Sequence, residues 1–214
     1  MNFLAHLHCS PNHELIRVFN FTGDGFRGTT WKAQATPEKI IGVELHRFID
    51  SFTDTHPTSK KAKAVLRENA GKTAPIALDL FGDYFLHKHW DKMKELQSFT
   101  SEVSVEAFIQ TCFSQIHVAD HLLEGKAARM WTFMRSENWL MDYKYLSGIK
   151  RAAMGMSRRH PAIKPLGVFF NRLEKGDSSY IAAEQWFLSF YPELITACTK
   201  FIEEHPLAKR ISRL

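Results

Sequence analysis

The chain has 214 residues, of which 44% are hydrophobic and 24% are charged, and its formal net charge at pH 7 is +5. These values are ordinary for a globular domain with a sizeable core. No stretch approaches about 18 apolar residues without charges, which excludes a membrane-spanning helix. Three widely spaced cysteines exclude a disulfide framework and a zinc ribbon and favour reduced thiols in a cytoplasmic protein.

The first 28 residues combine short apolar runs with histidine and glycine. Residues 2–8 predict a short helix that carries His6 and His8, and a second helical piece is expected over residues 13–21. The loop at 22–28 contains three glycines together with Asp24 and Arg27. Glycines at this density indicate unusual backbone angles or the close approach of another group. The N-terminal run lacks a basic start, so no signal peptide is expected.

The stretch from residue 42 to residue 56 predicts one helix with a row of polar residues next to an apolar stripe. Thr36 followed by proline is a typical helix start, and the proline at position 57 is expected to end the helix. His46, Asp50 and Asp54 recur at intervals of four, which places them on one side. An apolar stripe lies next to them, formed by Leu45, Phe48, Ile49 and Phe52. Polar groups at such an edge need partners or a metal, because an unpaired buried charge is costly.

A second acidic row is expected on a helix from residue 73 to about residue 96. Asp79, Asp83 and His87 again recur at intervals of four, and His89 lies off this row. Two acids four apart repel each other, so they are tolerated when a cation lies between them or when one points elsewhere. A solvated helix face is the alternative interpretation of this row.

The rest of the chain also predicts helices. They are expected at 58–70, capped by Thr58 or Ser59, and at 104–123, 126–142 and 145–156, with a basic turn at 157–161. A last helix is expected from residue 179 to residue 204, bent at Pro192. Strand alternation is nowhere sustained. The sequence therefore predicts an all-α, single-domain multi-helix bundle that spans residues 1–214.

The first 90 residues hold an unusual density of histidine and aspartate. Imidazole nitrogen and carboxylate oxygen together suit Mn²⁺, Fe²⁺ or Zn²⁺, and the absence of a cysteine cluster argues against a structural zinc site. Sites of this type usually leave positions open for water and a phosphate oxygen. Arg27 or Arg47 is suited to a phosphate oxygen. The pair His117 and His121 lacks an HExxH motif and is interpreted as surface or core.

Five groups of motifs occur together in this chain: MNFLAHLH at the start, GDGFRG at 23–28, HRFIDSFTD at 46–54, APIALDLFGDYFLHKHW at 74–90, and SENWLMDY with GMSRRHP further on. As an ordered set over nearly the whole chain, they resemble the acyl carrier protein phosphodiesterases. These holo-carrier hydrolases are sometimes regarded as unusual relatives of the HD-type metal phosphohydrolases, so the resemblance implies an HD-like helical fold. Where the family has a Gly-Asn pair before its loop, this chain has Phe19 and Asn20.

The resemblance implies hydrolysis of the phosphodiester that joins 4′-phosphopantetheine to a serine of acyl carrier protein. The products are apo-carrier and free 4′-phosphopantetheine, and a divalent metal, Mn²⁺ in the first place, is implied. The motif residues of the family fall here at His6, Asp24, His46, Arg47, Asp50, Asp54, Asp79, Asp83 and His89. His87 does not belong to the motif.

Role assignments combine the chemistry of the residues with the resemblance. The expected metal ligands are His6, Asp24, His46, Asp50, Asp79 and Asp83. We expect Arg27 and Arg47 to bind phosphate, and Asp54 or His89 to assist proton transfer. An acidic carrier protein needs a positive rim, for which the candidates are Lys60, Lys61, Lys63 and Arg158 with Arg159. No nucleic-acid or membrane partner is expected.

Two other functions are compatible with the sequence. One is an HD-like hydrolase of nucleotides or of another small phosphodiester. The other is a non-catalytic helical binding module, in which the acidic residues pair with arginines instead of a metal. Turnover of holo-carrier against cyclic nucleotides separates the first from the carrier hydrolase, and a metal analysis of the purified protein separates the second.

Overall fold

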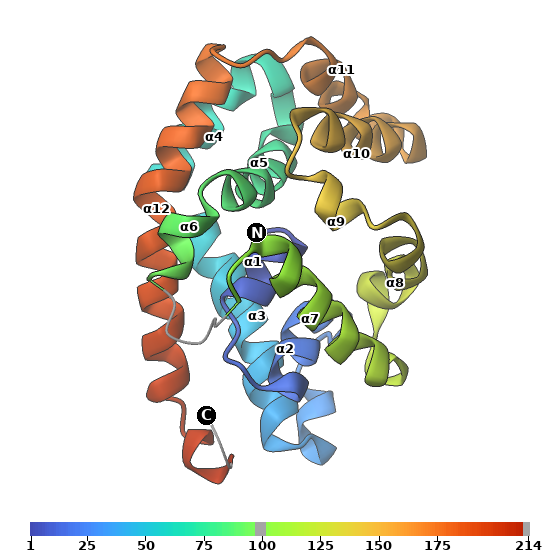
Figure 1. The fold of residues 1–214 in the computed structure, drawn as a ribbon, viewed down its shortest axis with the longest axis vertical. Helices are drawn as coiled ribbons and strands as arrows, with labels where there is room; N and C mark the ends of the chain where they lie inside the picture. Colours follow the sequence, from blue (N-terminus) through green and yellow to red (C-terminus); the bar gives the residue numbers. More distant parts are fainter. Residues whose placement is uncertain (97–101, 212–214) are drawn as a thin grey trace.

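The computed structural model describes residues 1–96 and 102–211, and every regular element within these ranges is a helix (Figure 1). The α-helices are α1 (Phe3–His8), α2 (Glu14–Phe21), α3 (Pro37–Thr55), α4 (Pro57–Ala70), α5 (Ala74–Lys88), α6 (Trp90–Lys94), α7 (Val105–Val118), α8 (Gly125–Glu137), α9 (Trp139–Asp142), α10 (Leu146–Arg159), α11 (Lys164–Arg172) and α12 (Ser178–Glu203). Short 3₁₀ turns include η1 (Gly23–Gly25), which follows α2. The all-α fold class is confirmed.

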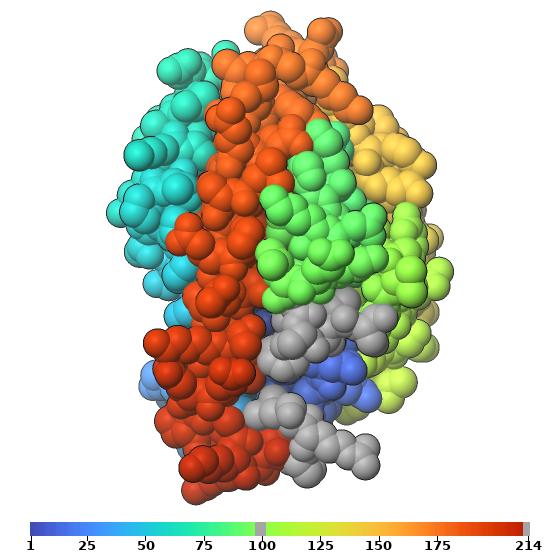
Figure 2. Space-filling model, turned by 60° about the vertical axis from the view of Figure 1, so that its left-hand side comes forward, coloured from blue at the N-terminus to red at the C-terminus, as the bar shows by residue number. Residues whose placement is uncertain are grey.

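The long helix α12 runs along one side of the molecule and packs against α3, α4 and α5 (Figures 1 and 2). In the lower half of the molecule as drawn in Figure 1, α2 packs along α3. Helix α1 lies against both α2 and α5. One main hydrophobic core joins these helices, with contributions from Phe3 to Ile202. Within the described ranges, no helix has the length and apolarity that crossing a membrane requires.

The start of α3 follows the prediction, whereas the start of α4 does not. The Thr36 side chain accepts a hydrogen bond from the Lys39 amide at 3.3 Å, as expected of an N-cap. For α4 the prediction of Thr58 or Ser59 as the cap is wrong. The His56 ring accepts the Thr58 amide at 3.3 Å, and the proline at 57 occupies the first helical position.

Two predicted helices are interrupted in the structure. The helix expected over 73–96 ends at Lys88, and α6 begins after a break at His89. The helix expected over 126–142 is divided at Asn138, which adopts the left-handed conformation with φ 49°. Asparagine tolerates this conformation better than most residues. The break redirects the chain so that Leu140 and Tyr143 enter the core. Residues 157–159, predicted as a turn, are the last turn of α10.

Candidate metal centre

Two histidines and one aspartate from distant parts of the sequence meet between α1 and α3. One ligand atom from each of His6, His46 and Asp50 lies within 4.8 Å of the others, and this is the group of three found among the described residues. The His6 Nε2 atom is 3.2 Å from Asp50 Oδ1, and the His46 Nε2 atom is 3.3 Å from Asp50 Oδ2. The two imidazole rings are stacked with their centroids 4.2 Å apart.

Asn20 of α2 orients both imidazole rings. His6 Nδ1 donates to the Asn20 side-chain oxygen at 3.1 Å, and His46 Nδ1 donates to the Asn20 backbone carbonyl at 2.7 Å. The Asn20 amide nitrogen is itself held, because it donates to the His6 carbonyl and to the Ser10 hydroxyl, both at 2.8 Å. A carbonyl partner on Nδ1 leaves Nε2 as the atom that can bind a metal.

The electrostatics of the three residues fit a cation. Burial, together with the neighbouring His6, lowers the pKa of His46 to about 3, so its ring is neutral at pH 7. Burial opposes ionisation of Asp50, but His6, the Met1 amino group and His46 outweigh it and hold the pKa of Asp50 below its usual range. A lone pair on His46 Nε2 therefore faces a carboxylate oxygen. These two acceptors repel unless a positive charge lies between them.

Two more carboxylates lie at the edge of this cluster. Asp24 Oδ1 in η1 is 3.7 Å from His46 Nε2. The loop reaches this position because Gly23 packs directly on His46, and a Cβ atom added at Gly23 would lie 2.4 Å from the His46 Cβ. Asp79 of α5 joins through the Met1 amino group, which is 3.4 Å from Asp79 Oδ1 and 3.3 Å from Asp50 Oδ1. The Asp24 and Asp50 side chains are 42% and 44% exposed, so the cluster is accessible to solvent.

Asp83 of α5 was predicted as a metal ligand, but its side chain reaches the first turn of α1. Its carboxylate is fully buried and accepts hydrogen bonds from the Leu4 and Ala5 amides at 3.2 and 3.1 Å. Burial raises the pKa of Asp83 to about 7, against the opposing effect of these two amides. Asn2, the N-cap residue of α1, makes no side-chain cap bond. Asp83 therefore caps α1 from a distance of about 80 residues along the chain.

We expect Asp83→Ala to lower the free energy of unfolding by about 3 kcal/mol, because two buried amides lose their acceptor. Urea denaturation of the purified variant measures this loss. Asp91→Ala is the matched control: Asp91 is an exposed acid paired with Lys94, and its loss is expected to cost under about 0.5 kcal/mol. Equal stability of the Asp83 variant and the control would contradict the capping role.

Several other predicted residues lie outside the cluster. Asp54 is 72% exposed and pairs with Lys63 at 2.6 Å. His89 pairs with Glu184 of α12 at 2.7 Å. Arg47 donates to the carbonyls of Phe26 and Gly28, so its guanidinium holds the loop that carries Asp24. Arg27 is exposed on that loop. His87 is buried, with Nε2 hydrogen-bonded to the Leu140 carbonyl.

The fold and the cluster define a class of protein: an all-α protein with a two-histidine, one-carboxylate centre suited to a divalent cation. Residues 1–194 match the family model described as acyl carrier protein phosphodiesterase, and the chain belongs to that family. It is accordingly a phosphoric diester hydrolase. No solved structure matches the chain.

Curated relatives of the same name agree with the family match. A protein of Photorhabdus laumondii is 32% identical over 91% of this chain and 93% of its own length. One from Yersinia enterocolitica is 31% identical over 92% of this chain and 96% of its own length. One from Escherichia coli O157:H7 is 29% identical over 94% of this chain and 98% of its own length. Each is called an acyl carrier protein phosphodiesterase.

Proposed function

We propose that this protein hydrolyses, in a metal-dependent reaction, the phosphodiester that joins 4′-phosphopantetheine to the serine of holo-acyl carrier protein. The observation that carries the proposal is the convergence of His6, His46 and Asp50 in a chain that belongs to this family. We further propose that residues 1–214 act as one domain. A cytoplasmic, reducing location is part of the proposal and is supported by the free, buried state of Cys9, Cys112 and Cys198.

In this proposal each residue of the cluster has a defined task. His6, His46 and Asp50 hold a divalent cation, Mn²⁺ in the first place, and Asn20 fixes the orientation of both imidazoles. When bound, such a cation neutralises charge on the phosphoryl group and lowers the pKa of water. Asp24 lies at the solvent-exposed side of the cluster, where its carboxylate can accept a proton from the attacking water.

We assign phosphate binding to Arg27 rather than to Arg47. Arg47 already donates to two loop carbonyls and lies over the Trp31 ring at 5.5 Å, so its guanidinium positions the loop. Arg27 is exposed on the same loop, three residues after Asp24. Its planar guanidinium is suited to bidentate contact with phosphate oxygens.

The experiment that tests the proposed function is incubation of holo-carrier with the enzyme and Mn²⁺, followed by mass spectrometry of the carrier. We expect conversion to apo-carrier with release of free 4′-phosphopantetheine. A parallel incubation with cyclic nucleotides tests the alternative of a small-phosphodiester hydrolase. Turnover of the nucleotides without cleavage of the carrier would overturn the proposal in favour of that alternative.

We expect Asn20→Ala to weaken Mn²⁺ binding by about 10–100-fold, since the residues that orient metal-binding imidazoles typically have effects of this size. Isothermal titration calorimetry of the metal-free protein measures the affinity. Asn171→Ala is the matched control, because Asn171 is exposed on α11, away from the cluster. Wild-type affinity in the Asn20 variant would show that the ring orientation is set by other groups.

A further inference from the structure

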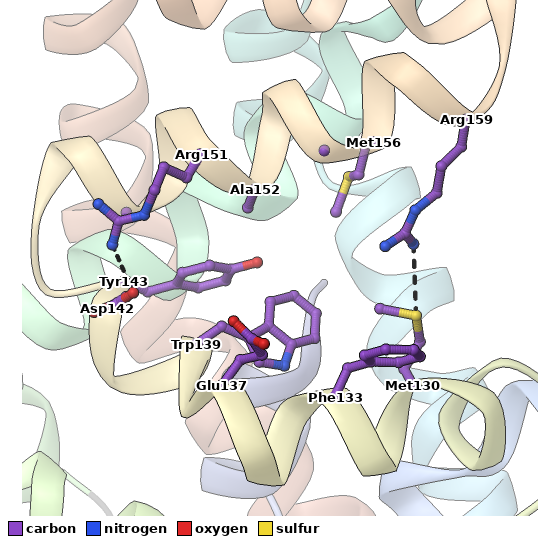
Figure 3. Close-up of a pocket in the computed structure, with 12 residues that line it drawn as sticks. Met130, Phe133, Glu137, Trp139, Asp142, Tyr143, Arg151, Ala152, Met156 and Arg159 are labelled. Carbon is purple, nitrogen blue, oxygen red and sulfur yellow. Dashed lines mark hydrogen bonds and ion pairs between the residues drawn. The ribbon is translucent and has the colours of Figure 1, made fainter.

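A groove lies between α8 and α9 on one side and α10 on the other (Figure 3). Its volume is about 350 Å³. Apolar and thioether side chains line most of it: Met130, Phe133, Trp139 and Met156. On the α10 side the groove is lined by the small residues Ala152 and Gly155, which leave room for a ligand. Such a groove suits a narrow, partly apolar ligand of extended shape.

Buried hydrogen-bond donors without acceptors lie at this groove. Tyr143 is fully buried, and neither its hydroxyl nor the indole N–H of Trp139 makes a hydrogen bond within the described part of the chain. The Asn2 amide lies beside the Tyr143 hydroxyl and can donate to its oxygen, which leaves the hydroxyl hydrogen of Tyr143 without an acceptor. In Figure 3 the Tyr143 hydroxyl points into the space between the helices. A buried donor that lacks an acceptor is costly, so these groups indicate a ligand with carbonyl oxygens.

The first residues of the chain lie between the groove and the candidate metal centre. The Trp139 ring packs edge-on against Phe3, with ring centroids 6.1 Å apart. Phe3 lies one helical turn before His6 on α1. The amino group of Met1, two residues before Phe3, contacts Asp50. Thus the first three residues of the chain separate the groove from the cluster.

Helix α8 extends from the loop that carries Asp24 to the groove. Its first residue, Gly125, packs on Gly25 of η1, next to Asp24. The Lys126 ammonium lies over the Phe3 ring, 5.2 Å from its centroid. Lys126, Met130 and Phe133 follow at helical spacing and so share one face of α8. This face leads from the loop of Asp24 to the groove.

From these observations, and resting on the proposed function, we propose that the groove holds the pantetheine arm of the substrate while its phosphodiester lies at the metal centre. The arm alternates apolar segments with two amides and ends in a thiol. Its amide carbonyls accept hydrogen bonds from the Tyr143 hydroxyl and the Trp139 indole. Its apolar segments lie against Met130, Phe133 and Met156. The groove therefore makes the enzyme select diesters that carry this arm over small phosphodiesters.

A leucine at position 155 tests the proposal without disturbing the packing. A Cβ atom added at Gly155 meets no heavy atom within 4 Å, and leucine is favoured over glycine in a helix. The larger side chain occupies the groove from the α10 side. We expect Gly155→Leu to raise KM for holo-carrier at least tenfold. The ratio of kcat/KM for holo-carrier to that for bis(4-nitrophenyl) phosphate, which lacks the arm, should fall by the same factor.

The matched control is Ser147→Leu, which adds the same side chain at an exposed position in the first turn of α10. It should leave both kinetic constants within twofold of the wild type. Tyr143→Phe removes one donor and keeps the ring, and we expect it to raise KM for holo-carrier about fivefold. A wild-type KM in Gly155→Leu, with active wild-type enzyme, would overturn the groove assignment and leave the proposed function intact.

Binding of free pantetheine gives a readout that does not depend on activity. Titration of the metal-free protein, followed by tryptophan fluorescence or calorimetry, should show saturable binding in the wild type and in Ser147→Leu, and loss of binding in Gly155→Leu. If the wild type does not cleave holo-carrier, the proposed function fails. This titration then tests only whether the groove binds pantetheine. Binding that is lost in Gly155→Leu supports the site, and no binding in the wild type overturns it.

Discussion

Replacing Asp50 by asparagine is expected to lower the rate of holo-carrier hydrolysis at least about 1,000-fold, which corresponds to about 4 kcal/mol of transition-state stabilisation. Asp50 is the carboxylate that contacts both His6 and His46. Asparagine keeps the shape but removes the negative charge that a cation between the imidazoles requires. One of the two side-chain oxygens also becomes an amide nitrogen, a donor that cannot bind a metal.

The control for this variant is Asp54→Asn, one turn further along α3. Asp54 is exposed and pairs with Lys63, so its change should leave kcat/KM within about twofold of the wild type, as expected of a surface ion pair. Initial rates measured by mass spectrometry of the carrier compare the variants, and circular dichroism checks their folding. Equal losses in both variants would show that the row of α3 acts as a unit and that the cluster geometry is not decisive.

The sequence pattern identified the helix of the candidate site but not which residues of its polar row belong to the cluster. Residues four apart on a helix are rotated by about 40°, so Asp54 lies about 80° from His46 around the axis. Over this angle the row leaves the side that faces α1. Spacing alone predicted that His46, Asp50 and Asp54 share a side, whereas the position of α1 decides which of them lie in the cluster.

Long-range placement was the part that spacing could not provide. His6 reaches Asp50 across 44 residues, and Asp83 reaches Leu4 across 79. The row of α5 predicted Asp83 as a ligand, and the structure shows both its carboxylate oxygens bonded to α1 amides. The six residues of α1 are too few for a stable isolated helix, so packing and this remote cap determine its position.

Asn20 was missed, although the sequence held a signal for it. An asparagine between Phe19 and Phe21, in a helix with apolar neighbours, is buried and must satisfy its amide there. The resemblance pointed to the same place, since the family has a Gly-Asn pair ahead of the loop. No proline or glycine marks the two interruptions of predicted helices at His89 and Asn138. Both interruptions follow from the packing of Trp90 and Leu140 in the core.

Removal of divalent cations is expected to abolish hydrolysis, with a loss of at least about 100-fold after dialysis against a chelator, and added Mn²⁺ is expected to restore it. Without a cation, the lone pair on His46 Nε2 and the Asp50 Oδ2 oxygen face each other at 3.3 Å and repel. Calorimetry should show one set of Mn²⁺ sites in the wild type and none in His46→Ala. Asp54→Asn is again the control, because it lies outside the cluster and should bind Mn²⁺ as the wild type does. Full activity in the chelated protein, or Mn²⁺ binding that survives His46→Ala unchanged, would mean that the three residues serve the fold and that the cation site lies elsewhere.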